Sequence, residues 1–334
     1  MIDLEKALLN PRAYDSKTKR VKLIKSLVNF VFLTDNFVYK IKQPTVRFEG
    51  KINYTTLANR KRATLEEYKV NKIFSPSIHI GVVPIRAGTN SNIGINIGGK
   101  TLDYALKIKR LPENCELSEL IRLHKVKNKD VILLADTLRR IHQKLPRRRR
   151  FARYASLRSL QQRWQETFDW MQEPHMKKIV AANFYHHLTA WHKKYSRLFH
   201  LLLAARQPFT QRIHGDLNTE NIFYVRGTYH FIDVNQLLKE WEYGDPLNDV
   251  GAIAKDFDAY GQDELGNLFV TSYLGGLTDS TTSVVQFYKM YWAAIRYSVY
   301  ADILARRARK EWKRTDMVRA KLYRILVERY LRVP

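Results

Sequence analysis

The chain has 334 residues, 45% of them hydrophobic and 27% charged, a composition typical of a soluble globular protein with one large domain or two modest ones. It has no run of eighteen apolar residues and no apolar leader at its start, and a single cysteine excludes an intrachain disulfide, so we predict a cytoplasmic protein without a transmembrane segment. Lys and Arg number 58 against 32 Asp and Glu, and the net charge of +26 either favours anionic partners (nucleic acid, anionic lipid or a phosphorylated substrate) or is only solvated surface.

The first 110 residues alternate β-rich runs with one helical segment. Two of these runs flank the turn Thr34-Asp35-Asn36, which is typical of a hairpin. The helical segment is rich in charged helix formers and has apolar residues at the spacing of one helical face. The predicted elements are a short helix (4–9), a hairpin (28–33 and 37–42), a helix (53–74) and two further strands (78–85 and 102–109) linked by a Gly/Asn-rich turn.

After Pro112 the pattern changes to the periodicity of helices. The predicted elements are two helices (117–123 and 131–145), a long helical and aromatic-rich stretch (156–205), a strand pair (222–225 and 229–232) and further helices to the end. We therefore predict an α+β fold with two lobes. The small β-rich lobe, with one main helix, takes residues 1–110, and the larger, mostly helical lobe takes residues 111–334.

Residues 214–221, His-Gly-Asp-Leu-Asn-Thr-Glu-Asn, and residues 231–233, Phe-Ile-Asp, form the most informative pattern. Asn221 follows Asp216 by five residues, and Asp233 follows twelve residues later, at the end of an apolar run. Two oxygen donors that flank a short loop can hold hard cations, and Asp216 can orient or deprotonate a hydroxyl group. This order is that of kinase-type phosphoryl transfer. The alternative is a His-Gly-Asp turn with two unrelated polar residues nearby.

The same segment resembles the Brenner motif of the aminoglycoside phosphotransferase family. Residues 244–251 are similar to the Gly-Asp-Pro-x-x-Asp-Leu-Ala segment of that family, and residues 31–44 to a strand pair, Val-Phe-Leu-Thr-Gly-Asp-Tyr-Val-Tyr-Lys-Ile-Lys-Lys-Pro, of one of its branches. Glu67 and Asn71 match the Glu-x-x-x-Asn of the helix that follows in that branch. The resemblance runs from about residue 20 to 330 and implies a bilobal protein-kinase-like fold with ATP and Mg²⁺ as cofactors.

The resemblance also implies a role for each motif residue. Lys40 would clamp the ATP phosphates with Glu67 as its partner, and Asp216 would act as base or orienting group. The remaining roles are magnesium binding by Asn221 and Asp233, positioning of the catalytic loop by His214, and bracing of that loop by Asp249. The expected reaction moves the γ-phosphoryl group of ATP to a hydroxyl of a small molecule, which the sequence does not identify.

Two rival nucleotide sites are also present in the sequence. Lys42 is the alternative to Lys40, and we expect it on the opposite face of the strand. Residues 94–101, Gly-Ile-Asn-Ile-Gly-Gly-Lys-Thr, formally satisfy the P-loop pattern. A P-loop needs a helix N-terminus after it, whereas the residues after Lys100 alternate like a strand. We therefore favour Lys40 and predict a turn at residues 98–99.

The chain also departs from the family. No glycine occurs in residues 25–29, where phosphate-binding amides would be expected, and Gln236 stands where the family usually has a Glu. These departures and the basic charge motivate an alternative function, a catalytically weak, pseudokinase-like module that binds an anionic polymer or lipid. The four arginines at 147–150, followed by Phe151 and Tyr154, could contact such phosphates or form a solvated helix start.

Overall fold

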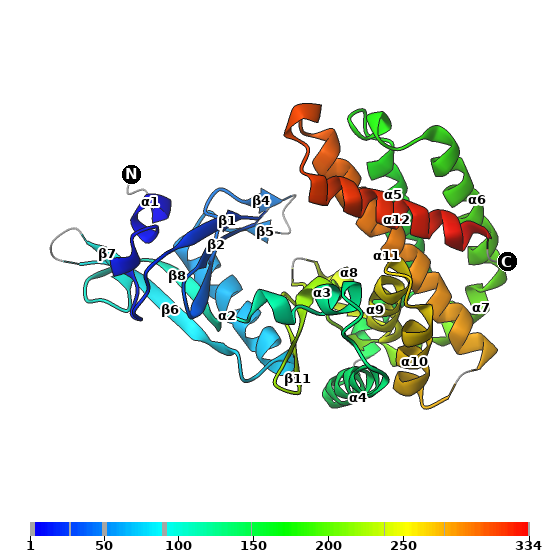
Figure 1. Cartoon of the computed structure of the whole chain (residues 1–334), viewed down its shortest axis with the longest axis horizontal. Coiled ribbons are helices and arrows are strands. Elements are labelled where there is room, and N and C mark those ends of the chain that lie inside the picture. Colours follow the sequence, from blue (N-terminus) through cyan, green and yellow to red (C-terminus); the bar gives the residue numbers. More distant parts are fainter. Residues whose placement is uncertain are drawn as a thin grey trace. The chain divides into compact units, whose positions relative to one another are not determined.

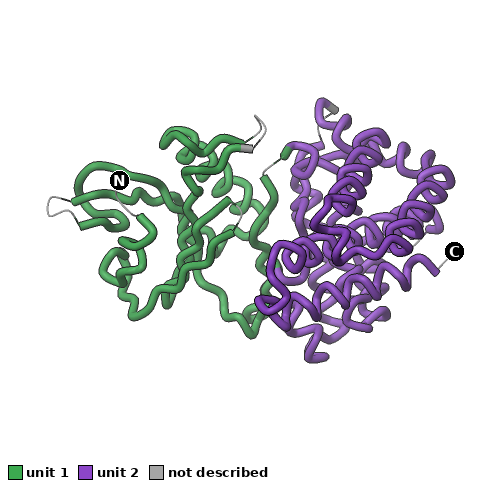
Figure 2. Tube along the Cα trace, turned by 90° about the horizontal axis from the view of Figure 1, so that it is seen from above, with its two compact units in different colours: residues 1–116, 221–238 green, residues 117–220, 239–334 purple. Residues whose placement is uncertain are grey.

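The computed structural model describes residues 4–26, 28–48, 52–88, 92–147, 149–236, 238–276 and 278–332. The chain forms two compact units: residues 1–116 with 221–238, and residues 117–220 with 239–334 (Figure 2). A short segment from the middle of the sequence therefore belongs to the first unit. The lobe limits of 1–110 and 111–334 stay a prediction.

The first unit is built on an antiparallel sheet with the strand order β1-β2-β3-β8-β6-β7. Its strands are β1 (Lys22–Lys25), β2 (Asn29–Leu33), β3 (Phe37–Lys42), β6 (His79–Ala87), β7 (Ile93–Ile95) and β8 (Lys100–Lys109). Helix α2 (Leu57–Phe74) packs against this sheet, mainly on β8 and β6 (Figure 1). The smaller elements are α1 (Leu4–Leu8), η1 (Pro11–Ala13), η2 (Glu113–Cys115), the pair β4 (Arg47–Phe48) and β5 (Ile52–Asn53), and the pair β10 (Ile222–Val225) and β11 (Thr228–Phe231).

The predicted hairpin and the main helix are both present. Thr34 closes the turn between β2 and β3, because its hydroxyl accepts a hydrogen bond from the Phe37 N–H and donates one to the Phe37 carbonyl. Thr56 caps α2 by accepting a hydrogen bond from the Asn59 N–H, so the helix begins at Leu57 and not at residue 53. Strands β1 and β7 have no counterpart among the predicted elements.

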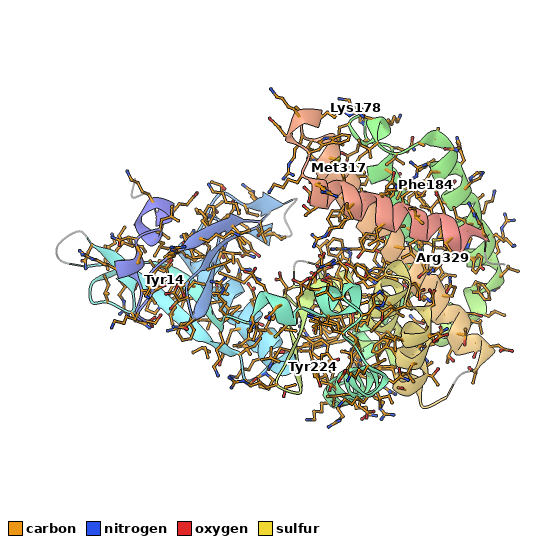
Figure 3. All side chains as sticks on the ribbon, in the orientation of Figure 1. Tyr14, Lys178, Phe184, Tyr224, Met317 and Arg329 are labelled. Atoms are coloured by element: carbon orange, nitrogen blue, oxygen red, sulfur yellow. The ribbon has the colours of Figure 1, made fainter. Side chains whose placement is uncertain are left out.

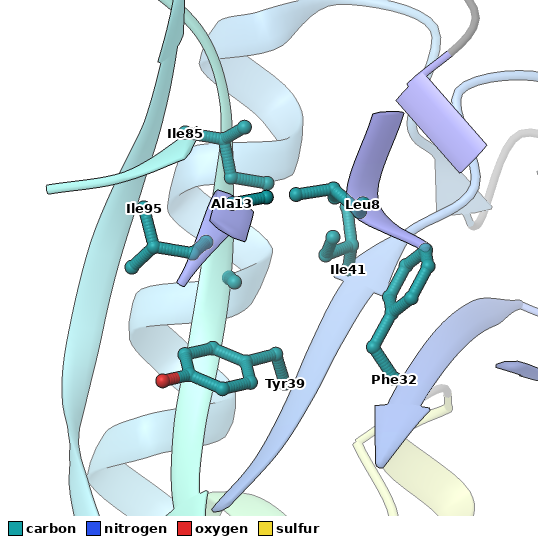
Figure 4. Packing of buried hydrophobic residues seen from close by; sticks show 8 residues of the cluster. Leu8, Ala13, Phe32, Tyr39, Ile41, Ile85 and Ile95 are labelled. Atoms are coloured by element: carbon teal, nitrogen blue, oxygen red, sulfur yellow. The ribbon is translucent and has the colours of Figure 1, made fainter. Parts of the chain in front are cut away.

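The two faces of β3 pack against different parts of the first unit. Tyr39 and Ile41 lie on one face, in a buried apolar cluster (Figure 4). The members of this cluster are Leu8, Ala13, Phe32, Tyr39, Ile41, Ile85, Ile95 and Ala105. Val38 belongs to a separate cluster that includes a tyrosine of α2. Because side chains alternate along a strand, Lys40 and Lys42 share the face of Val38.

Residues 94–101, which match the P-loop pattern, link two strands. Gly94 lies in β7, and Lys100 is the first residue of β8. Between them Asn96 and Gly99 have left-handed backbone, with φ of 56° and 114°, and a Cβ at Gly99 would lie 1.9 Å from the carbonyl oxygen of Ala87. The prediction that a strand follows this segment is confirmed, and a strand offers no converging amides to a phosphate.

The second unit is mainly helical. Its longer helices are α4 (Asn128–Lys144), α5 (Leu157–Met171), α6 (Ala182–Leu198), α9 (Leu247–Ala259), α10 (Asp263–Leu274), α11 (Asp279–Ala305) and α12 (Arg314–Arg332). Its short elements are α3 (Leu117–Arg122), η3 (Arg149–Ala155), η4 (Met176–Lys178), α7 (His200–Ala205), η5 (Gln207–Phe209), β9 (Gln211–Arg212), α8 (Lys239–Glu242), β12 (Tyr243–Gly244) and η7 (Arg309–Glu311), together with the first two residues of η6 (Thr219–Asn221), whose last residue belongs to the first unit. The predicted α+β class, with a β-rich first part and a helical second part, is confirmed (Figure 1). Among the described helices, none is both long enough and apolar enough to cross a membrane.

Helix α11 packs against both α9 and α12, and Gly251 lies at the closest approach of α9 to α11. A Cβ at Gly251 would lie 2.6 Å from the Cβ of Tyr288 and 3.0 Å from the backbone nitrogen of Lys289. Real Cβ atoms do not approach this closely, so any larger residue would push the two helices apart. The glycine therefore sets the spacing of α9, the helix that carries Asp249.

We expect Gly251→Ala to lower the free energy of unfolding by about 1–3 kcal/mol, because the added methyl group overpacks the contact with α11. Urea unfolding followed by circular dichroism measures this change. Gly81→Ala is the matched control, since a Cβ at Gly81 meets nothing within 4 Å. Equal stability of the two variants would contradict the close approach.

Candidate active site

One stripe of α2 faces the residues around Asp233. Glu67 and Asn71 lie one turn apart on the same side of α2, and Ser75, the residue that caps the C-terminal end of the helix, follows four residues later. The Asn71 side chain accepts a hydrogen bond from the Val234 N–H at 3.2 Å and donates one to the Glu67 carbonyl at 2.9 Å. The Ser75 hydroxyl accepts a hydrogen bond from the Phe231 N–H at 2.6 Å. The stripe thus fixes the backbone on both sides of Asp233.

Lys40 bridges the two carboxylates that the sequence assigns to the nucleotide site. Its Nζ lies 2.5 Å from Asp233 Oδ1 and 3.2 Å from Glu67 Oε1. The Lys40 side chain is only 10% exposed. Burial lowers the pKa of Lys40, but the charges of Asp233 and Glu67 outweigh burial and raise this pKa above its usual value. Lys40 is therefore a charged, positioned cation.

Lys42 contacts the same glutamate, with its Nζ 2.5 Å from Glu67 Oε2. The expectation that Lys40 and Lys42 lie on opposite faces of the strand is wrong, because residues two apart on a strand point the same way. Burial raises the pKa of Glu67, but Lys42 and Lys40 together hold it at about 2. The two lysines still differ, since only Lys40 also contacts Asp233.

We expect Lys42→Met to raise the pH of acid unfolding. The pKa of Glu67 lies at about 2 in the folded chain against an ordinary 4.5, so its ionised form stabilises the fold above pH 4.5 and this stability is lost as the pH falls towards 2. Without Lys42 the folded pKa of Glu67 rises, and the loss begins at higher pH.

The acid-unfolding midpoint, followed by tryptophan fluorescence, tests this expectation. Lys69→Met is the control, because Lys69 pairs with Glu66 on the exposed side of α2, and exposed pairs contribute little stability. If the midpoint of Lys42→Met coincides with that of Lys69→Met, the lysine is not what keeps Glu67 ionised.

Asp233 combines an exposed carboxylate with a constrained backbone. Its side chain is 55% exposed, and its φ of 64° lies in the left-handed region, which Asp tolerates better than most residues. The carbonyl of Asn221 accepts a hydrogen bond from the Ile232 N–H, which ties residue 221 to the chain beside Asp233. Mg²⁺ takes one or two protein oxygens together with water and phosphate oxygens, so a carboxylate and an amide fit this ion. Gln236 adds no charge, and its side-chain amide lies 3.4 Å from the Glu67 carbonyl.

In the second unit, Asp249 holds the backbone of the His-Gly-Asp segment. Its carboxylate is fully buried and accepts hydrogen bonds from the His214 N–H at 2.7 Å and the Gly215 N–H at 3.1 Å. Nε2 of His142 lies 3.1 Å from the same carboxylate. Gly215 has a φ of 77°, which turns the chain sharply just before Asp216. This geometry suits the bracing that the resemblance implies for Asp249.

A second aspartate of α9 holds the far end of the same loop, and sequence reasoning misses it. Asp256 Oδ2 accepts hydrogen bonds from the N–H of Thr219 at 2.9 Å and from its hydroxyl at 3.0 Å. Asp256 follows Asp249 by two helical turns, so both carboxylates lie on one side of α9. That seven-residue spacing is the signal that could have found it. The next residue of the loop, Glu220, contacts Arg296 and Arg319.

The predicted site residues fall into two groups. Lys40, Glu67 and Asp233 meet in the first unit, to which Asn221 also belongs. The other residues, Asp216, His214 and Asp249, belong to the second unit. The structure thus gives each group its local geometry, and their joint role in one site stays a prediction.

The basic run at 147–150 falls partly outside the described residues, since residue 148 is not among them. Arg147 and Arg150 are exposed and stack over Phe209 and Phe151, with 5.1 Å and 4.7 Å between guanidinium carbon and ring centre. Stacked arginines keep most of their hydrogen-bond donors free for other partners. Contact of this run with a polyanion stays a prediction.

Three solved structures with a similar fold are a kinase family protein and two phosphotransferases. A choline/ethanolamine kinase family protein from Mesorhizobium loti has 13% identity and a TM-score of 0.55, over 96% of this chain and 90% of its own. An aminoglycoside phosphotransferase of the APH(2″) type, solved with GDP and kanamycin, has 10% identity and a TM-score of 0.52, over 98% of each chain. Spectinomycin phosphotransferase with ADP and spectinomycin has 11% identity and a TM-score of 0.50, over 100% and 99%. The fold is therefore kinase-like.

The family follows from the sequence itself. The model of the phosphotransferase enzyme family matches residues 107–287, more than half of the chain, so this protein belongs to that family. Uncharacterised proteins of Mycobacterium tuberculosis and Mycobacterium bovis are 22% identical over 272 residues, which is 80% of this chain and 52% of theirs. The chain thus spans about half the length of the curated relatives that it matches. The predicted resemblance to aminoglycoside phosphotransferases is confirmed.

Proposed function

We propose that the protein transfers the γ-phosphoryl group of ATP to a hydroxyl group of a small molecule. The observation that carries this proposal is the bridge of Lys40 between Glu67 and Asp233, because a buried cation held by two acids, one of them exposed, suits a nucleotide–metal complex. Family membership supports phosphoryl transfer, and the ADP and GDP in two similar enzymes support a nucleotide donor. A cytoplasmic location, where ATP is available, is part of the proposal.

Each residue has a defined part in this reaction. Lys40 donates hydrogen bonds to phosphate oxygens. Glu67, which Lys42 helps to keep ionised, holds Lys40 in place and charged. Asp233 and Asn221 hold Mg²⁺, which neutralises charge on the phosphates when bound. Asp216 accepts the proton of the acceptor hydroxyl while the hydroxyl oxygen bonds to the γ-phosphorus. The bond between the γ-phosphorus and the bridging β-phosphate oxygen breaks, and ADP leaves. Asp249 and Asp256 fix the loop that carries Asp216, so its carboxylate needs little reorganisation.

Turnover of ATP against a panel of hydroxyl compounds tests the proposal. The panel holds neutral, cationic and anionic acceptors, with GTP as the alternative donor, and the readout is transfer of labelled γ-phosphate. We expect Mg²⁺-dependent transfer to at least one acceptor and its loss in Asp216→Asn. Asp263→Asn is the control, since Asp263 is a half-exposed acid at the start of α10 that pairs with Arg329.

The alternative function is the pseudokinase-like module for an anionic polymer or lipid, motivated by Gln236 and the net charge of +26. It predicts nucleotide binding without transfer to any acceptor or to water. It also predicts salt-dependent binding to polyanions that Asp216→Asn leaves unchanged. The same panel therefore separates the two functions.

A further inference from the structure

Two arginines from different helices meet at one carboxylate of the catalytic loop. Arg296 of α11 and Arg319 of α12 each place Nη2 on Glu220, at 2.5 Å and 2.7 Å. Glu220 stands between Thr219, which Asp256 holds, and Asn221. Helix α12 runs beside α11, and Met317 and Arg329 mark its two ends in Figure 3.

This cluster has more cationic donors than the loop carboxylate uses. Arg296 is 12% exposed and gives Nη2 to both Glu220 and the Tyr300 hydroxyl, while its buried Nε has no hydrogen-bond partner among the described residues. Arg206, by contrast, donates hydrogen bonds from both Nε and Nη2 to the carboxylate of Asp245. A buried guanidinium N–H without a hydrogen-bond acceptor raises the free energy of the folded state unless a ligand supplies the acceptor. Arg319 is 40% exposed and so can be reached.

The remaining charges around the cluster are matched or lie on the loop. Lys255, fully buried, pairs with Asp256 at 2.5 Å, so this pair adds no net charge. Tyr300 and Tyr323 stack with parallel rings, and the Arg296 guanidinium lies over both. Burial lowers the pKa of Arg296, but Tyr323, Tyr300, Glu220 and Asp216 outweigh it and raise this pKa above its usual value. Asp216 is thus part of the electrostatic surroundings of Arg296.

We propose that Arg296 and Arg319 bind an oxyanion group, a phosphate or a carboxylate, of the acceptor molecule. The acceptor is then an anionic hydroxyl compound whose charged end lies at these arginines and whose hydroxyl meets Asp216. Guanidinium groups bind such oxyanions with paired, charge-assisted hydrogen bonds. Glu220 already pairs with Nη2 of both arginines and therefore competes with the oxyanion group of the acceptor. This inference rests on the proposed function.

Binding of inorganic phosphate, measured by calorimetry with the nucleotide site filled by ADP and Mg²⁺, tests the arginines without catalysis. We expect Arg319→Ala to weaken phosphate binding by about tenfold or more, since it removes a charged hydrogen bond. Arg324→Ala is the control, because Arg324 lies on the same helix and pairs with Glu328 at the surface. Its binding of phosphate should equal that of the wild type.

Glu220→Gln separates an anion site from a purely structural clamp. If the arginines bind an oxyanion, removal of the competing carboxylate should tighten phosphate binding. If Glu220 and the arginines only hold the loop, Glu220→Gln and Arg319→Ala should change phosphate binding in the same direction or leave it as it is. Either of these results overturns the proposal, as does a wild type that binds no phosphate.

Matched acceptors then identify the source of the oxyanion. Glucose 6-phosphate against glucose tests phosphate, and glycerate against glycerol tests carboxylate. We expect one charged acceptor to be preferred, and Arg319→Ala to raise its KM by about tenfold while kcat changes less. ADP formation in the absence of acceptor reports on the proposed function separately. If ADP forms but neutral acceptors are used equally well, the inference about the arginines fails and the phosphotransferase stands.

Discussion

Asp233→Asn should reduce Mg²⁺-dependent ATP turnover by at least about a hundredfold, because charge stabilisation at a transferring group is usually the largest catalytic contribution. Asparagine keeps the volume of aspartate and tolerates the left-handed backbone, with its φ of 64°, better than alanine does. The substitution therefore removes the charge without adding strain. It also removes one of the two anions that pair with Lys40.

Initial rates of ADP formation across a range of Mg²⁺ concentrations measure this effect. Asp35→Asn is the matched control, since Asp35 is an exposed turn residue of the same unit whose carboxylate accepts a hydrogen bond from the Lys19 N–H. A thermal melt confirms that both variants fold. Turnover by Asp233→Asn within a factor of about three of the wild type would remove Asp233 from the metal site.

Lys40→Met should lower kcat/KM for ATP by about a hundredfold or more, because the phosphates lose a cation that is already positioned and charged. Methionine keeps the apolar stem of the side chain. Glu67 keeps Lys42 as a partner at 2.5 Å, so the substitution does not leave a buried carboxylate alone. The loss should therefore be catalytic and not a loss of folding.

Two further lysines control for this prediction. Lys100→Met changes the first residue of β8, where no set of amides converges, and should leave ATP turnover as it is. Lys42→Met removes a charge from the same glutamate but no contact with Asp233, and should cost far less activity than Lys40→Met. A larger loss in Lys100→Met than in Lys40→Met would restore the P-loop interpretation of residues 94–101.

Local patterns predicted the parts of the fold that local interactions decide. The hairpin β2–β3 has a clear turn between apolar runs, and α2 has helix formers over five turns, so both were predictable. Strand β1 was not predictable, because Lys22 and Lys25 flank only two apolar residues on an exposed edge strand and no alternating pattern results. Strand β7 has three residues in a Gly/Asn-rich stretch, too few for a periodic signal.

The candidate site shows the same division. The order of Asp216, Asn221 and Asp233 is a property of the sequence and needs no structure. The partners of Glu220 cannot be predicted from the sequence in this way, because Arg296 and Arg319 come from two helices far along the chain and nothing in their spacing marks them. In a chain with 58 Lys and Arg, composition alone cannot single out the two arginines that meet one carboxylate.

The stripe of Glu67, Asn71 and Ser75 has a consequence for how the first unit could change state. One residue of an α-helix corresponds to a rotation of about 100°. A rotation of α2 by that amount would take Glu67 from Lys40 and, in the same movement, take Asn71 and Ser75 from the backbone of Val234 and Phe231. The ion pair of Lys40 with Glu67 and the backbone on both sides of Asp233 therefore depend on the same rotational setting of α2. A rotation of the helix would disrupt both sets of contacts at once.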